Sequence, residues 1–333
     1  MSPLMINEVL AHPQDITWLP WAVQYFFFIG IAACSALLAC VLHGRQPELE
    51  RLTLLIGLTC AIAAPLALTA DLHQTARVWH FYAWPTPWSW MPWGALFLPL
   101  FTGFIGLWFA AAWVEKIYGK TFALTRLITF ACALTAIGLL LYTGREVSVV
   151  RARPLWFSWW FPLAMVLSAF QTLLALLIAA TRHQPWRQKL ARALAVTLGL
   201  LAITVALWLA GNTLSGAAMR NWLAWPQAQS LAAGWVLLWL ITFGAALWTI
   251  KHPGLVVGIA LALASMALSW LMRWTLLMEG QTLPKYNALF NPYSLPSGTD
   301  GLLAIVGTFG LWIALLILVR EIVHGVLRRN HHA

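Results

Sequence analysis

The sequence contains very little charge. Asp, Glu, Lys and Arg make up only 9% of its 333 residues, while 61% are hydrophobic and the mean hydropathy is +0.78. A soluble domain has about 25% charged and about 45–50% apolar residues. Because so apolar a chain cannot cover a surface exposed to water, the composition excludes a soluble globular protein and predicts an integral membrane protein.

Residues that bind metals are missing from the places where a metal centre would need them. The four cysteines lie inside apolar runs and form no Cys-x-x-Cys pair, so the chain offers no ligand set for zinc or an iron–sulfur cluster. A haem within the bilayer usually needs two histidines at similar depth, but no apolar run carries a histidine at its middle. We therefore expect neither haem nor an iron–sulfur cluster in this chain, which argues against a haem-b quinol oxidase subunit.

Nine apolar runs have the length of a membrane span. A helix needs about 20 apolar residues to cross a hydrocarbon core of about 30 Å. The first run lacks a basic segment before it and a small-residue cleavage site after it, so we expect it to be retained. The sequence thus predicts an all-α, polytopic bundle with residues 1–19 outside the cytoplasm, a transmembrane domain at 20–323 and a cytoplasmic tail at 324–333. The runs are 20–42, 52–74, 93–115, 125–143, 158–181, 192–211, 230–250, 254–276 and 301–323.

Basic residues gather on one side of the predicted membrane. Of the 20 Lys and Arg residues, 13 lie in the loops after odd-numbered spans and in the C-terminal tail. The positive-inside rule then predicts an outer N-terminus and a cytoplasmic C-terminus. Because the net charge of +10 arises in these short loops, it does not indicate nucleic-acid binding. Arg145, Arg151 and Arg153 are an exception on the outer side, close to a stretch rich in Trp and Pro at 79–93 for which we expect a rigid, non-helical surface.

Polar side chains within the spans cluster toward the outer leaflet, where each is a functional candidate because it is costly in lipid. Asp71 either pairs with Arg77 or exchanges protons, and His73 and His80 either accept protons or anchor the chain at the interface. His73 and His80 would share a face if the second helix continued past residue 80. The other members of this group are Gln24, Tyr25, Tyr142, Arg145, Glu146 and Arg273. Gln171, in the middle of the fifth run, is interpreted as a helix–helix hydrogen bond.

Two short motifs carry a family resemblance. The run DLHQTARVWH at residues 71–80, followed by SWMPWGA at 89–95, resembles the signature of the NrfD-type, polysulfide-reductase-like membrane subunits. In that family an Asp-Leu-Gly-Arg-Pro-x-Arg run closes the second helix and a Ser-x-Met-Ser-Trp-Gly run opens the third. This sequence departs from the pattern at His73, Gln74, Thr75 and Pro92.

The resemblance implies a haem-free membrane anchor in the bacterial inner membrane that oxidises menaquinol or ubiquinol. It also implies a four-helix quinone-binding bundle followed by further helices. Electrons would pass to an extracytoplasmic ferredoxin-like iron–sulfur subunit bound to a molybdopterin catalytic subunit. Carried onto this chain, the quinol contacts would be Gln24 or Tyr25, and Tyr142.

The residues near that predicted site complete the hypothesis. Asp71 and His73 would take the protons of the quinol as catalytic residues, with Arg77 and His80 beside the head group. The alternative is a secondary transporter, which would use buried polar residues to bind its substrate near the middle of the bilayer.

Overall fold

The computed structural model describes residues 16–72, 74–119, 121–283 and 293–331. These ranges contain no strand, and nine of their helices are long and apolar enough to cross a membrane, which confirms the predicted fold class. The nine spans are α1 Pro20–Leu42, α2 Pro47–Asp71, α4 Met91–Tyr118, α5 Thr125–Ser148, α6 Trp160–Ala180, α7 Gln184–Ala210, α9 Pro226–Lys251, the continuous span Leu255–Thr282 and the span Leu302–Arg328 of α12. The span Leu255–Thr282 comprises α10 Leu255–Trp274, the π-helical turn η2 Thr275–Glu279 and α11 Gly280–Thr282.

Proline and glycine mark several of the helix ends. Proline stands in the first turn of α1, α2, α4, α7 and α9, where its missing N–H costs no hydrogen bond. Gly119 ends α4 in the left-handed conformation, with φ of 65°, and its N–H bonds to the carbonyl of Glu115. The span boundaries are therefore set by local chemistry as well as by hydropathy.

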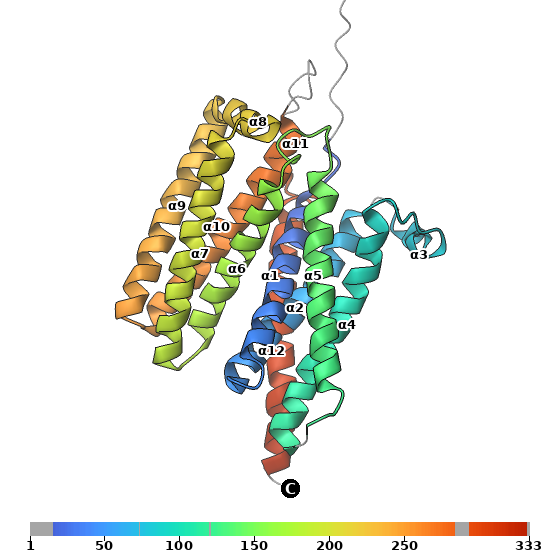
Figure 1. The fold of residues 1–333 in the computed structure, drawn as a ribbon, viewed down its shortest axis with the longest axis vertical. Coiled ribbons are helices and arrows are strands. Elements are labelled where there is room, and N and C mark those ends of the chain that lie inside the picture. Colours follow the sequence, from blue (N-terminus) through green and yellow to red (C-terminus); the bar gives the residue numbers. More distant parts are fainter. Residues whose placement is uncertain (1–15, 73, 120, 284–292, 332–333) are drawn as a thin grey trace, which may run out of the picture.

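Helix α1 lies at the centre of the bundle and contacts α2, α5, α6, α10 and α12 (Figure 1). Helices α4 and α5 lie to one side of it, and α7 and α9 lie to the other (Figure 1). Helix α9 has few buried residues, and large aliphatic side chains on its surface are exposed, as expected of a helix that faces lipid. We call the end of the bundle where α1 begins the outer end, and the end where α1 finishes the inner end.

Short helices cover the outer end. Helix α2 ends at Asp71, and the chain then passes through a 3₁₀ turn, η1 Thr75–Arg77, and α3 His80–Ala83. The second helix does not continue past residue 80, so it does not place His73 and His80 on one face; His73 itself is outside the described residues. The prediction of a wholly non-helical surface at 79–93 is wrong for α3 and for the start of α4. Helix α8, Leu214–Leu223, lies at the same end (Figure 1).

Two buried polar groups join helices inside the bundle. Gln171 on α6 donates to the carbonyl of Ser265 on α10 at 2.9 Å, which confirms its interpretation as a helix–helix hydrogen bond. Arg273 on α10 is fully buried and donates to the carbonyls of Phe26 and Met165 and to the hydroxyl of Ser168. Since its guanidinium is satisfied by α1 and α6, this cation connects three helices.

Candidate functional site

A cavity of about 450 Å³ lies between α1, α2, α4 and α5 toward the outer end, beneath η1 and α3. Apolar side chains form most of its wall, and a few hydroxyls and one carboxyl group interrupt them. This is the usual character of a site for a small organic molecule with polar ends. The lining residues are Tyr25, Pro65, Leu68, Thr69, Leu72, Val78, Phe81, Tyr82, Met91, Gly94, Ala95, Leu98, Pro99, Thr102, Tyr142 and Glu146.

Two prolines inside helices line this cavity from different sides. Pro65 interrupts α2 and Pro99 interrupts α4, and each removes a backbone hydrogen bond within its helix. The carbonyl of Ala61, which Pro65 deprives of its usual donor, instead lies 3.4 Å from the hydroxyl of Thr102 on α4. The same hydroxyl donates to the carbonyl of Leu98 at 2.9 Å, so the freed carbonyl of Ala61 receives a long, shared hydrogen bond across the interface of the two helices.

Tyr25 and Tyr142 bring phenol groups to the cavity from α1 and α5. Both side chains are buried, and the hydroxyl of Tyr25 has no hydrogen-bond partner among the described residues. Gly94 on α4 makes room for Tyr142, because a Cβ atom there would overlap the tyrosine ring. An unpaired buried hydroxyl is costly, so a polar ligand would find a ready partner in Tyr25.

Glu146 lies one helical turn after Tyr142 and lines the same cavity. Glu146 interacts electrostatically with the phenol groups of both Tyr142 and Tyr25. Within the described part of the chain, no cationic nitrogen lies within 4 Å of its carboxylate. The sequence showed Glu146 beside Tyr142 at the end of a span, but this position alone did not single it out as a site residue.

Several predicted site residues point elsewhere. Gln24 donates to the carbonyl of Ile305 on α12 at 3.2 Å, away from the cavity. Asp71 ends α2 and accepts a hydrogen bond from the N–H of Leu19 at 3.1 Å, so it fixes the start of α1. Arg77 is exposed, and the ring of His80 packs against Trp79 and Trp84. These four residues surround the outer end without lining the cavity.

The three outer arginines differ in their surroundings. Arg153 donates to the carbonyl of Gln281 at 2.7 Å, and its partial burial lowers the pKa of its guanidinium. Arg145 lies over the ring of Trp159, with its guanidinium carbon 4.3 Å from the ring centroid. Arg151 is exposed. Arg151 is therefore the most accessible of the three charges, while Arg145 and Arg153 are partly buried.

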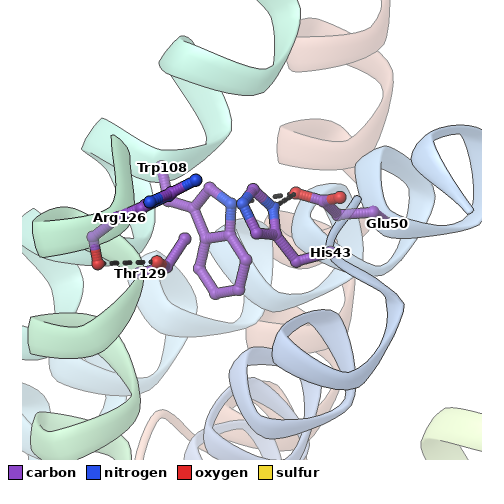
Figure 2. A network of polar contacts seen from close by, with 5 residues as sticks. All are labelled: His43, Glu50, Trp108, Arg126 and Thr129. Carbon is purple, nitrogen blue, oxygen red and sulfur yellow. Dashed lines mark hydrogen bonds and ion pairs between the residues drawn. The ribbon is translucent and has the colours of Figure 1, made fainter. Parts of the chain in front are cut away.

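A second polar cluster occupies the inner end. Nδ1 of His43 lies 2.9 Å from Oε1 of the buried Glu50, and the indole N–H of Trp108 donates to the same oxygen at 3.0 Å. Figure 2 shows these three side chains together, with the bond from Thr129 to the Arg126 carbonyl nearby. Across the described ranges, no group of three or more His, Cys, Asp or Glu residues could hold a metal ion.

Comparison with known proteins agrees with this architecture. Residues 8–285 match the family model described as polysulphide reductase, NrfD, so the chain belongs to the NrfD family. It is also 60% identical to a tetrathionate reductase subunit of Salmonella typhimurium over 335 aligned positions, which cover 99% of this chain and 98% of that protein. The resemblance of residues 71–95 to the family signature is thereby confirmed.

Proposed function

We propose that this protein is the membrane subunit of a tetrathionate reductase and that it oxidises quinol in the cavity between α1, α2, α4 and α5. The observation that carries the proposal is the convergence of Tyr25, Tyr142 and Glu146 on one apolar cavity. The near full-length similarity to the Salmonella tetrathionate reductase subunit supports the choice of complex. Residues 8–25 also resemble the start of the membrane subunit of tetrathionate reductase in sequence.

The cavity suits the chemistry of a quinol. The head group is flat and apolar with a hydroxyl at each end, and its oxidation releases two protons and two electrons. Tyr25 and Tyr142 are placed to hydrogen-bond the ring oxygens, and Glu146 is placed to accept a proton. Burial of the ring between aliphatic side chains excludes water from the reacting oxygens. The electrons leave the chain, since we assign the metal centres to partner subunits.

Asp71 and His73 remain candidates for the proton acceptor, as the sequence predicts. The bond from the Leu19 N–H to Asp71 favours a structural role for that carboxylate. Glu146 is the stronger candidate because it lines the cavity and interacts with both tyrosines. Measuring quinol oxidation in variants of Asp71 and of Glu146 distinguishes these assignments.

A steric block of the cavity tests the function directly. Ala95 lines the cavity on α4, whereas no atom lies within 4 Å of a Cβ placed on Gly103 of the same helix. In the assembled complex, Ala95→Trp should abolish quinol oxidation, while tetrathionate reduction driven by an artificial dye continues. Gly103→Trp is the matched control and should retain both activities. Normal quinol oxidation by the Ala95→Trp complex would contradict the proposal.

The outer end is the proposed docking surface for the iron–sulfur subunit, which in turn binds the molybdopterin subunit. Trp84 and Trp88 are 66% and 85% exposed there, and Arg151 adds an accessible charge. So large an apolar surface is expected to bind a partner. Trp88→Ala combined with Arg151→Glu should reduce co-purification of that subunit, whereas Trp248→Ala at the inner end should not. Equal recovery from the two variants would contradict this assignment.

We further propose that the inner end faces the cytoplasm of a bacterial cell, as the distribution of basic residues predicts. A reporter that is active only in the cytoplasm should work when fused after Ala333. Activity of only an extracytoplasmic reporter at that position would reverse the orientation.

A further inference from the structure

A second cavity, of about 360 Å³, opens at the inner end between α2, α4, α6 and α12. It lies at the opposite end of α2 and α4 from the proposed quinol cavity. Its floor is apolar and includes Leu52, Leu55 and Phe109. Its rim is strongly basic, with Arg51, Lys116, Arg182 and Arg320.

The basic side chains of this rim outnumber the carboxylates in its lining. Among the described residues, none of the four cations forms an ion pair within 4 Å. Glu48 is the one carboxylate in the lining, although Glu115 and Glu50 also act electrostatically on Arg51. Glu50 is already bonded to His43 and Trp108. The rim therefore keeps an excess of positive charge next to an apolar floor.

Trp113 gives an independent indication of a ligand. It lines the same cavity, and its buried indole N–H has no hydrogen-bond partner among the described residues. Arg51 and Lys116 both lie over its ring, with the charged groups 5.7 and 5.0 Å from the ring centroid. An N–H donor without a partner on a ring that also contacts two cations suits an anionic oxygen.

We propose that this cavity binds the phosphate-bearing head group of an anionic phospholipid. Basic pockets between transmembrane helices are suited to such head groups. The apolar floor distinguishes a lipid from free phosphate, because it accommodates the glycerol and the upper part of the acyl chains. Arg320 lies on α12 and Arg182 just after α6, so the lipid would hold these segments against α2 and α4.

The test measures lipid binding to the purified full chain in detergent by native mass spectrometry. Phosphatidylglycerol and phosphatidylcholine with identical acyl chains are compared, and inorganic phosphate is added as a competitor. We expect phosphatidylglycerol to bind about tenfold more tightly than phosphatidylcholine and to resist displacement by millimolar phosphate. Equal binding of the two lipids, or displacement by phosphate, would overturn the proposal.

Variants assign the binding to this cavity. Arg182→Gln with Arg320→Gln should weaken phosphatidylglycerol binding by about fivefold for each arginine removed, which is the usual effect of one basic residue near an anionic surface. Arg192→Gln with Lys251→Gln removes two exposed charges from the same end outside the cavity and should change binding less than twofold, by about the error of the measurement. An equal loss in both double variants would show that only the general charge of the inner end matters.

Glu48→Gln provides a test in which the expected result is stronger binding, which a misfolded variant would not show. It removes the carboxylate from the rim, so it should strengthen phosphatidylglycerol binding by about threefold to fivefold. Unchanged or weaker binding in this variant would contradict the site. Because none of these measurements involves quinol, their outcome is independent of the proposed catalytic function.

Discussion

The two cavities of this protein are built on the same pair of helices and have opposite chemistry. Both lie against α2 and α4, and their volumes are about 450 and 360 Å³. The outer cavity has three phenols and a carboxylate, whereas the inner cavity has four cations, one carboxylate and an indole. Under the two proposals, α2 and α4 would bind an uncharged quinol at their outer ends and an anionic lipid at their inner ends.

The backbone differs between the two ends as well. Pro65 and Pro99 lie inside continuous helices at the outer cavity, while the described inner-end turns of α2 and α4 contain proline only at the start of α2. A proline inside a helix bends it and frees a carbonyl, which opens space between neighbouring helices. Charged side chains therefore distinguish the inner cavity, and prolines within the helices distinguish the outer one.

The largest expected effect comes from Glu146→Gln, which keeps the shape of the side chain but removes its basicity. If Glu146 accepts a proton from quinol, turnover should fall by about 10²–10⁴-fold. The measurement is quinol oxidation by the intact complex, with dye-driven tetrathionate reduction as the control for the partner subunits. The dye-driven rate should not change.

Asp71→Asn is the matched variant, because it makes the same chemical change outside the cavity. An amide can still accept the hydrogen bond from the Leu19 N–H, so we expect a much smaller loss than in Glu146→Gln. If Asp71→Asn loses more quinol oxidation than Glu146→Gln, Asp71 is the proton acceptor, as the sequence predicts. Similar small losses in both variants would direct attention to His73.

Gly94→Ala should have the next largest effect. The added Cβ would overlap the Tyr142 ring, so the ring must move away from its place in the cavity. A displacement of about 1 Å at a reacting group can cost about 10²-fold, and we expect quinol oxidation to fall about tenfold to a hundredfold. Gly103→Ala on the same helix meets no neighbouring atom and should retain full activity. Equal activity of the two variants would show that Tyr142 need not hold its position.

Hydropathy alone predicted the nine spans within several residues, because nearly every span must be apolar along its length. The candidate site was less accessible to sequence reasoning. Tyr25 and Gln24 are adjacent in the chain, yet one enters the cavity and the other bonds to α12, about 280 residues away. To distinguish them, one must know which face of α1 points toward the cavity, and that orientation is set by packing against five other helices. The basic rim also depends on how the helices pack. In the sequence its arginines and lysine therefore indicated only the orientation of the chain in the membrane.

Replacing either tyrosine with phenylalanine should have a moderate effect. Tyr142→Phe or Tyr25→Phe removes one hydroxyl and keeps the ring that fills the wall of the cavity. The loss of one neutral hydrogen bond costs about 0.5–1.5 kcal/mol, which corresponds to about threefold to tenfold in quinol oxidation. Steady-state kinetics with varied quinol concentration provide the measurement. A loss as large as in Glu146→Gln would mean that the phenol itself takes part in proton transfer.

Variants of the inner cavity should have the smallest effect on quinol oxidation. They test whether the two cavities act independently. Arg182→Gln with Arg320→Gln changes the rim of the inner cavity, whose lining shares no residue with the outer cavity. Distant sites without shared partners usually act independently, so quinol oxidation per intact complex should change by less than about twofold. The assay is made in detergent with and without added phosphatidylglycerol. If the double variant loses turnover and added lipid does not restore it, then α2 and α4 transmit changes between their ends, and the two cavities form one coupled system.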